Sequence, residues 1–350
     1  MSTPMTLGAP VLEARDLTAS LPTDQGLLEA VNGVSFTLRA GRTLGLVGES
    51  GSGKSLTSKM LLRLNDKKFR ETGTIALAAS PTSGEEIDAD EIDLMSLRTD
   101  GPVIRSIRGR RIAMIFQEPM TAFSPLYTIG NQIMEVILLH RTSDPARARE
   151  ICLEMMRKVG IADAERRIDQ YPHEFSGGMR QRAMIAMALS CEPDILIADE
   201  PTTALDVTIQ AQVLDLMRSL QDEYGMAILF ITHDLGIVAQ VCDEVAVMYL
   251  GRIVEQAPVR DIFHNPQHPY TQGLLASIPR PGLKRTERLA SIPGPVPQPI
   301  GLAPSCGFAS RCAKRIEGVC DARIPATTDL GGDHTVRCFL HSDAAEGAKK

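Results

Sequence analysis

A glycine-rich stretch near the N-terminus has the residue types and spacing needed to bind phosphate groups. It follows the pattern G-x-x-x-x-G-K-S, leads directly into Leu56, and consists of Gly48, Glu49, Ser50, Gly51, Ser52, Gly53, Lys54 and Ser55. Glycines let the backbone curl so that successive N–H groups point at phosphate oxygens. The Lys54 ammonium can reach the outer phosphates, and the Ser55 hydroxyl can bind Mg²⁺. The stretch predicts a nucleoside triphosphate site, and an unliganded Gly/Ser turn is the alternative.

A pair of acidic residues follows a fully apolar run further along the chain. The run covers residues 195–198 and leads directly into Asp199 and Glu200. A strand there would bring the Asp199 carboxylate to the edge of a sheet, where it can hold Mg²⁺, usually through water. Glu200 could then polarise the water that attacks a γ-phosphate. The alternative is a strand that ends in two solvated acids.

A serine and two glycines stand at the start of a predicted helix. This third candidate element consists of Ser176, Gly177, Gly178 and Met179. A helix N-terminus binds anions because its free N–H groups and its dipole favour negative charge. The glycine-rich stretch at residues 48–55 already covers one side of the phosphates of a nucleotide bound to this chain. The glycine-containing helix start at residues 176–179 therefore suggests binding to a nucleotide that a partner subunit holds. An ordinary helix cap is the alternative.

These stretches lie within a regular alternation of strands and helices. Apolar runs predict core strands at residues 43–47, 112–116, 195–198, 227–231 and 245–248. Helical periodicity covers residues 55–64, 129–139, 146–159, 176–190 and 209–220. Such alternation indicates an α/β fold with a mostly parallel sheet.

Three regions before the second predicted core strand have weaker patterns. Residues 11–17 and 34–38 alternate like strands, whereas residues 66–100 show no regular pattern and carry an acidic stretch, residues 85–93, that we interpret as a solvated hairpin face. The basic run that follows is interpreted as a solvated helix face rather than a binding patch. It comprises Arg105, Arg108, Arg110 and Arg111.

Composition narrows the class of protein. The 350 residues carry a net charge of −6, 43% hydrophobic residues, 4% aromatic residues and no Trp. An acidic chain with few aromatic residues is unlike proteins that bind duplex DNA or stack on bases, so we expect no nucleic-acid partner. We see no signal peptide and no apolar run long enough to span a bilayer. Any membrane role is therefore expected to come through a partner.

Four of the seven cysteines gather near the C-terminus, with gaps of five, seven and seventeen residues between them: Cys306, Cys312, Cys320 and Cys338. In a cytosolic protein such a group favours metal binding over disulfides. Four thiolates suit either a [4Fe–4S] cluster or zinc. The C-x₂₋₄-C spacing typical of structural zinc is missing, which favours the cluster and leaves zinc as the alternative. Free or disulfide-bonded cysteines are the third possibility.

Residues 10–265 resemble the ATP-binding subunit of an ABC transporter. Residues 48–55 resemble its Walker A motif, and residues 195–200 resemble Walker B. Ser176 to Met179 resembles the signature L-S-G-G-Q, with Phe175 and Met179 in place of Leu and Gln. The remaining motifs match in order: Gln117 as the Q-loop, Ala204, Leu205 and Asp206 as the D-loop, and His233 as the H-loop.

The resemblance implies a fold and a set of roles. The expected fold is an ABC-type P-loop NTPase with a RecA-like sheet core, an antiparallel β subdomain, and a helical subdomain near residues 120–190 that carries the signature. Two subunits would form a head-to-tail sandwich with two ATP molecules at the interface. Glu200, His233 and Gln117 would be catalytic, and the signature would act on the ATP of the facing subunit. The family's usual adenine-stacking aromatic is missing from residues 18–30, where Leu28 or Gln25 lies nearest.

A narrower resemblance covers almost the whole chain. Residues 117–121, 198–208 and 268–271, and the Pro-rich and Cys-rich tail, are similar to the dipeptide, oligopeptide and nickel importer branch, in which the tail cysteines resemble an iron–sulfur site. The expected organisation is a flexible N-terminus (1–10), an ATP-binding domain (11–278), a Pro-rich linker (279–304), a Cys-rich region (305–340) and a flexible tail (341–350).

The branch implies the partners and the location. These are a second ATP-binding subunit, with a heterodimer favoured over a homodimer, two membrane-spanning permeases and an extracytoplasmic solute-binding protein. The chain would lie peripherally on the cytoplasmic face of a bacterial inner membrane and power import of peptides or related small solutes. A DNA-repair or chromosome-organising ATPase is the alternative. Such proteins carry long coiled-coil or zinc-finger insertions between Walker A and the signature, and the gap of about 120 residues here shows no sustained heptads.

Overall fold

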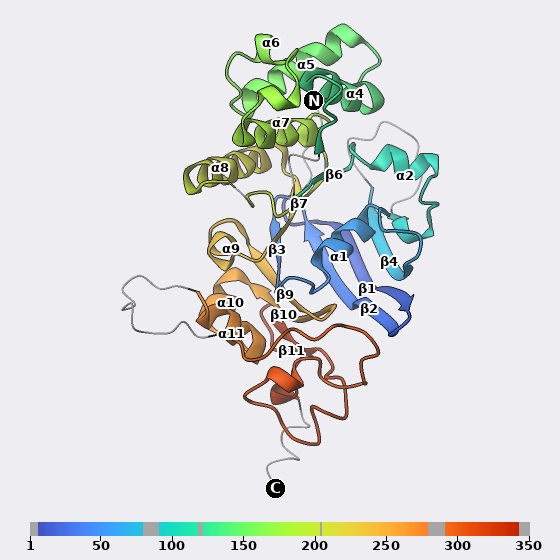
Figure 1. Ribbon diagram of the computed structural model, residues 1–350, viewed down its shortest axis with the longest axis vertical. Coiled ribbons are helices and arrows are strands. Elements are labelled where there is room, and N and C mark those ends of the chain that lie inside the picture. The colour runs from blue at the N-terminus through green and yellow to red at the C-terminus, as the bar shows by residue number, and fades with distance from the viewer. Residues whose placement is uncertain (1–5, 80–90, 118–121, 204, 279–290, 343–350) are drawn as a thin grey trace. The chain divides into compact units, whose positions relative to one another are not determined.

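The computed structural model describes residues 6–79, 91–117, 122–203, 205–278 and 291–342 (Figure 1). The chain divides into two compact units. The first unit comprises residues 1–12, 37–43 and 76–231, and the second comprises residues 13–36, 44–75 and 232–350. No helix within the described ranges combines the length and the apolar character needed to cross a bilayer.

Three parallel strands form the centre of the first unit. They are β6 (Ile112–Ile115), β7 (Ile195–Asp199) and β8 (Ala227–Thr232), with β7 in the middle. Every residue of β7 and β8 is buried, which explains why both strands read as continuous apolar runs instead of alternating. The prediction of parallel core strands is confirmed here.

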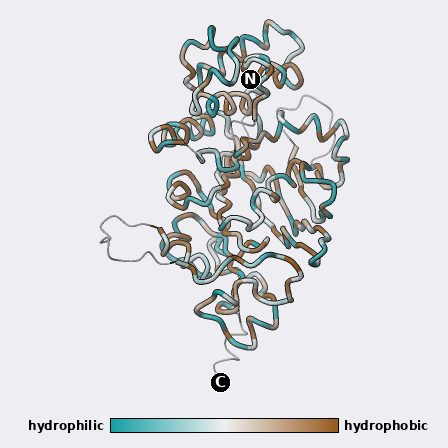
Figure 2. The backbone as a smooth tube through the Cα atoms, in the orientation of Figure 1, coloured by the Kyte–Doolittle hydropathy of each residue, from teal (hydrophilic) through white to brown (hydrophobic). Residues whose placement is uncertain are grey.

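Helices make up most of the rest of the first unit. They are α2 (Pro102–Ile107), α4 (Ile129–His140), α5 (Pro145–Lys158), α6 (Ala164–Arg167), α7 (Gly177–Leu189) and α8 (Val207–Tyr224). Side chains cap the N-termini of α4, α5, α7 and α8, as when Asp144 accepts a hydrogen bond from the Ala146 N–H at the start of α5. Hydrophobic and hydrophilic residues form bands along these helices (Figure 2), and each buries its apolar side.

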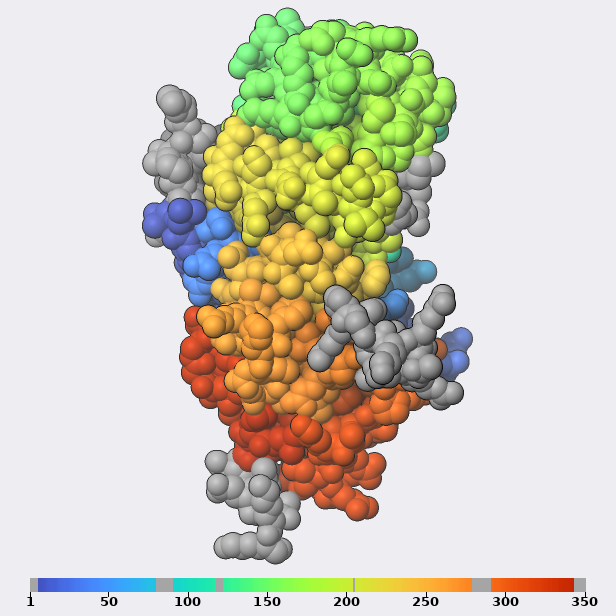
Figure 3. Space-filling model, turned by 90° about the vertical axis from the view of Figure 1, so that its left-hand side faces the viewer, coloured from blue at the N-terminus to red at the C-terminus, as the bar shows by residue number. Residues whose placement is uncertain are grey.

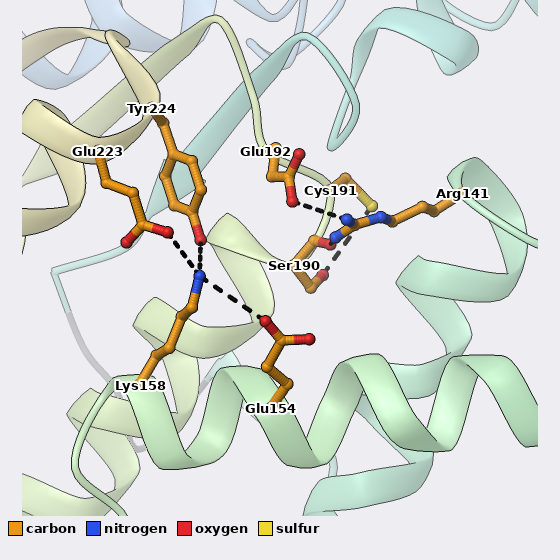
Figure 4. A network of polar contacts seen from close by, with 8 residues as sticks. All are labelled: Arg141, Glu154, Lys158, Ser190, Cys191, Glu192, Glu223 and Tyr224. Carbon is orange, nitrogen blue, oxygen red and sulfur yellow. Dashed lines mark hydrogen bonds and ion pairs between the residues drawn. The ribbon is translucent and has the colours of Figure 1, made fainter. Parts of the chain in front are cut away.

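A polar network links α5 to α8 within this unit (Figure 4). The Lys158 ammonium contacts Glu223 at 2.7 Å, the Tyr224 hydroxyl at 3.0 Å and Glu154 at 3.8 Å. Nearby, Arg141 at the end of α4 donates to the carbonyl of Ser190, just after α7. These contacts fix the ends of several helices relative to one another.

Two sheets and four helices build the second unit. In one sheet β3 (Thr43–Val47) pairs in parallel with β9 (Glu244–Tyr249), and β9 pairs with the antiparallel β10 (Arg252–Pro258). The other sheet has the order β2-β1-β4, with β1 at Pro10–Thr23, β2 at Gly26–Arg39 and β4 at Arg70–Ala78. The helices are α1 (Lys54–Leu61), α9 (Leu235–Val241), α10 (Val259–His264) and α11 (Pro269–Ala276).

Two expectations from the sequence are wrong. Residues 66–100 are not irregular: they contain β4, and β5 (Glu91–Asp93) pairs with Ala76–Ala78. Polar residues in the first half of β4 conceal the strand, because only its second half is buried. Arg111 also does not belong to a solvated face. It is buried and forms an ion pair of 2.8 Å with Asp194. Residues 85–90 of the predicted acidic hairpin lie outside the described residues.

The C-terminal region, residues 291–342, has little regular structure and packs within the second unit. Its short strand β12 (Thr335–Val336) extends the sheet by pairing with β10, and β11 (Thr328–Asp329) pairs with β12. Residues 299–301 bond to the backbone of β2, where the Glu29 N–H donates to the Pro299 carbonyl at 2.8 Å. Figures 1 and 3 show this region, in red, against the orange segment that contains α10 and α11.

His268, at the start of α11, should make stability depend on pH. It is 1% exposed, and burial lowers its pKa to about 3, while its Nδ1 accepts a hydrogen bond from the Tyr270 N–H. The unfolded chain binds a proton near pH 6.5 that the folded chain does not. The free energy of unfolding should therefore fall by up to ~1.4 kcal/mol per pH unit between about pH 6.5 and pH 3.

Chemical denaturation at pH 7 and pH 5 measures this dependence. His268→Asn keeps a capping oxygen and should reduce it, whereas His264→Asn, at an exposed position, should not. An equal pH dependence in the wild type and in His268→Asn would contradict the assignment.

Candidate functional site

The glycine-rich loop lies between β3 and α1, as the sequence predicts. Its backbone passes close to two carbonyl groups of other segments. A Cβ at Gly48 would lie 2.1 Å from the Met248 oxygen, and one at Gly53 would lie 2.3 Å from the Ala30 oxygen. Gly53 also has φ of 103°, which L side chains rarely adopt. Only glycine fits either position, so these two residues let the loop backbone pass close to β9 and β2.

Lys54, the first residue of α1, points back into this loop. It is 6% exposed, and its ammonium donates to the carbonyls of Gly48 at 2.8 Å and Glu49 at 3.0 Å. It also lies 3.4 Å from the Ser52 hydroxyl. Ser55 follows on the same helix, and Ser50 and Gly51 are exposed. The loop thus combines a buried cation, a hydroxyl and accessible backbone, which fits the phosphates and Mg²⁺ of ATP.

The acidic pair lies at the end of β7, and a second predicted residue meets it there. Asp199 is buried at the strand's last position. The Glu200 carboxylate accepts hydrogen bonds from Gln117 Nε2 and from the Thr203 hydroxyl, both at 3.0 Å. Glu200 has φ of 48°, a strained value for a non-glycine residue. The structure therefore holds this carboxylate in a fixed orientation, as water activation requires.

The signature residues begin α7 and are accessible. Ser176 caps the helix by accepting a hydrogen bond from the Met179 N–H, and Ser176 and Gly177 are exposed. A Cβ on Gly177 would meet nothing within 4 Å, whereas one on Gly178 would lie 3.1 Å from Ile209. The predicted open, anion-binding helix start is thus free to receive a ligand from outside the unit.

The remaining residues named in the sequence analysis lie near the ends of helices and strands. Asp206 caps α8 by accepting from the N–H groups of Thr208 and Ile209. Leu205 precedes it, and Ala204 lies outside the described residues. His233 is exposed just after β8 and directly before Asp234, the cap of α9. The structure brings Gln117 to Glu200 in the first unit, and it places the glycine-rich loop and His233 in the second.

Sequence reasoning missed three side chains around these residues. Thr203 supports Glu200 in the first unit. In the second unit, Tyr270 and Arg311 both contact Glu49 of the glycine-rich loop. Tyr270 lies in a stretch that resembles the importer branch, but nothing in its sequence context indicates a contact with residue 49.

The four C-terminal cysteines are free thiols. Cys320 belongs to a small apolar cluster with Ala309 and Phe339, and Cys306 packs against this cluster. Burial raises the pKa of Cys306 to about 11 and that of Cys338 to about 12. Across the described residues, which include all four cysteines, no group of three or more His, Cys, Asp or Glu side chains is placed to hold a metal ion. The predicted iron–sulfur or zinc site thus has no support in this arrangement.

Comparison with solved structures defines the fold class. The dimeric ATP-binding cassette MJ0796 bound to ADP and Pi is similar at a TM-score of 0.60 and 23% identity, over 71% of this chain and 99% of that one. CbiO1 of Clostridium perfringens, part of the ABC transporter complex cbiONQ, is similar at a TM-score of 0.58 and 24% identity, over 73% and 91%. The fold is that of an ABC-type ATPase.

Sequence comparison then gives the family. Residues 31–203 match the ABC transporter family, and residues 254–320 match the oligopeptide/dipeptide transporter C-terminal region. A putative peptide import ATP-binding protein of Brucella melitensis is 49% identical over 96% of this chain and 98% of that protein. The dipeptide transport ATP-binding protein DppD of Bacillus subtilis is 48% identical over 97% of each. The chain belongs to the ABC transporter ATP-binding family with this C-terminal region.

Proposed function

We propose that the chain is the ATP-hydrolysing subunit of an importer for dipeptides, oligopeptides or related small solutes. The observation that carries this proposal is the joint match to an ATP-binding domain and to the transporter C-terminal region, along nearly the full length of relatives named for peptide import. None of these similarities supports the alternative of a DNA-repair or chromosome-organising ATPase.

The proposed roles follow from the site. The loop from Gly48 to Ser55, with Leu56, binds the phosphates, and Lys54 carries the positive charge at the centre of the loop. On the resemblance to Walker A and Walker B, Ser55 and Asp199 are each proposed as a ligand of Mg²⁺, which offsets the negative charge of the phosphates. Glu200 orients and deprotonates the attacking water, and Gln117, already bonded to Glu200, links that carboxylate to the helices after β6.

His233 completes the proposed set by donating a hydrogen bond to the γ-phosphate. Its exposed side chain leaves it accessible to a ligand. The signature residues act on the nucleotide of a second ATP-binding subunit, because the start of α7 is accessible from outside. We favour a heterodimer over a homodimer, on the resemblance to the importer branch.

Two permeases and an extracytoplasmic solute-binding protein would complete the transporter, and the chain would lie peripherally on the cytoplasmic face of a bacterial inner membrane. Leu126 and Tyr127, after Gln117, are 78% and 57% exposed. Large exposed apolar side chains mark interaction surfaces. These two residues therefore belong to the surface that we expect to contact a permease.

Photo-cross-linking tests this proposal. A photoreactive amino acid at Leu126 or Tyr127 should cross-link to a permease in membranes, and the yield should change when ATP is added. Leu139, which is 70% exposed on α4 but lies outside the segment after Gln117 that we expect to face a permease, provides a matched position where we expect no permease adduct. Equal yields at Leu126 and Leu139, or none at Leu126, would contradict the importer model.

The iron–sulfur cluster stays a hypothesis, with zinc as its alternative. Its basis is the resemblance of the Cys-rich tail to the importer branch, and not the arrangement of the four cysteines. Protein purified without oxygen should then contain iron and sulfide and absorb near 400 nm, about where thiolate-to-iron charge transfer occurs. Stoichiometric zinc would replace the cluster assignment, and protein without either metal would reject the site.

A further inference from the structure

Glu49, in the glycine-rich loop, is held at both its backbone and its side chain by distant parts of the second unit. Its N–H donates to the Tyr270 hydroxyl at 2.9 Å. Its carboxylate receives both terminal nitrogens of Arg311, at 2.7 and 3.1 Å. This is the paired geometry in which Arg binds carboxylates most strongly. Arg311 is 6% exposed and the Glu49 side chain is 28% exposed, so the pair is only partly screened by water.

Arg311 is itself fixed in place. Its Nε donates to the Pro293 carbonyl at 3.0 Å, and its guanidinium lies 5.8 Å from the centre of the Tyr249 ring. It ends a short helix that begins at Ala309, a member of the small apolar cluster of the C-terminal region. The preceding Phe308 packs edge-on against Tyr249, with ring centroids 5.3 Å apart. The C-terminal region therefore presents a preformed cation to the loop.

The negative charge of Glu49 would disfavour phosphate binding, and the Arg311 guanidinium offsets this charge. A loop that binds a highly charged anion also carries a carboxylate one residue after its first glycine. An unpaired carboxylate there would repel the phosphates, and it would be free to move the start of the loop. The bonds to Arg311 and Tyr270 remove both effects, since one neutralises the side chain and the other fixes the backbone.

We propose that Arg311 is a positioning residue for the nucleoside triphosphate: it neutralises and orients Glu49, so that the C-terminal region sets the affinity of the loop for ATP. This inference rests on the proposed phosphate-binding role of the loop. It assigns an indirect part in nucleotide binding, exerted through Glu49, to a segment far in sequence from every ATP motif.

The test uses the full transporter and measures KM for ATP and kcat separately. Arg311→Met keeps most of the side-chain length but removes the charge, and it should raise KM about tenfold, equivalent to ~1.4 kcal/mol, with kcat within about twofold. Arg311→Lys should recover part of the loss, because an ammonium keeps the charge but not the paired geometry. Arg315→Met breaks an exposed ion pair with Asp321 in the same region and should leave KM unchanged.

A double variant distinguishes an effect of the Arg311 charge from an effect of Arg311 packing. Removing the carboxylate as well, in Glu49→Gln with Arg311→Met, should return KM to within about threefold of the wild type, since the repulsion is gone. A purely structural Arg311 would give a double variant as impaired as Arg311→Met. If Arg311→Met fails to fold, Arg311→Lys alone decides: it keeps the charge but loses the paired geometry and should raise KM about threefold, and an unchanged KM would overturn the proposal.

Lys54→Ala distinguishes this inference from the proposed function. Binding of a fluorescent ATP analogue should be strongly weakened by Lys54→Ala whether or not Arg311 matters. Unchanged binding in Lys54→Ala would overturn the loop's assigned role and the inference with it. Weakened binding in Lys54→Ala together with wild-type KM in Arg311→Met would overturn the inference alone.

Discussion

Replacing Glu200 by Gln should abolish ATP hydrolysis at the site of this chain's own glycine-rich loop and leave ATP binding intact. The amide has almost the shape of the carboxylate, and its oxygen can still accept hydrogen bonds from Gln117 and Thr203. What it cannot do is take a proton from water. Loss of a general base costs about 10²-fold or more in rate, whereas Lys54, Ser55 and the loop amides that bind the nucleotide are untouched.

The measurement compares single-turnover hydrolysis with ATP-analogue binding in the assembled transporter. Thr203→Val is the matched control, because it removes one hydrogen bond to Glu200 and keeps the base. It should slow hydrolysis less than about tenfold. Hydrolysis by Glu200→Gln within about threefold of the wild type would show that another group activates the water.

The sequence predicted those parts of the candidate site whose residues are neighbours along the chain. The eight residues from Gly48 to Ser55 are consecutive and lead from a loop into the first turn of α1, so their spacing alone indicates the phosphate-binding motif. Asp199 and Glu200 follow a run of apolar residues that can only be a buried strand. In both cases the residues that act together are neighbours along the chain.

Long-range pairings were not predictable in the same way. Arg311 and Glu49 are 262 positions apart, and no periodic pattern in the C-terminal region indicates where it will pack. Arg111 stands in a run of arginines that looks solvated, and only its partner Asp194, 83 residues away, makes its burial possible. The strained backbone of Glu200 is likewise set by its neighbours in space, since its N–H donates to the Ile231 carbonyl of β8.

The secondary-structure predictions were only partly correct. Elements with a strong local sequence pattern were predicted, and elements that depend on distant partners were missed. Core strands β7 and β8 are continuous apolar runs and the long helices have strong periodicity, and both were predicted with nearly the observed bounds. β4 was missed because its first half, beginning at Arg70, is polar and largely exposed. The C-terminal region was predicted only from composition, because short strands such as β12 gain their stability from pairing with β10 and not from their own sequence.

Gly177→Asp should remove hydrolysis at the site of the facing subunit while sparing this chain's own nucleotide binding. A Cβ at this position meets nothing within 4 Å, so the substitution causes no clash within the chain. Gly177 is the first residue of α7, where a carboxylate favours the helix because it interacts with the positive end of the dipole. The fold should therefore survive, and the new charge should lie where the partner's γ-phosphate is expected.

The decisive sample is a complex purified through two different tags, so that each particle holds one variant chain and one unmodified ATP-binding subunit. Glu200→Gln in the variant chain silences its own site, and the remaining hydrolysis then belongs to the facing loop. Adding Gly177→Asp to that chain should lower this remainder about 10²-fold, by electrostatic repulsion of the transition state. Gly177→Asn has the same size without the charge and should cost far less. If Gly177→Asp leaves the remaining activity unchanged, the signature does not act across the interface, and each subunit would have to hydrolyse ATP without help from its partner's α7.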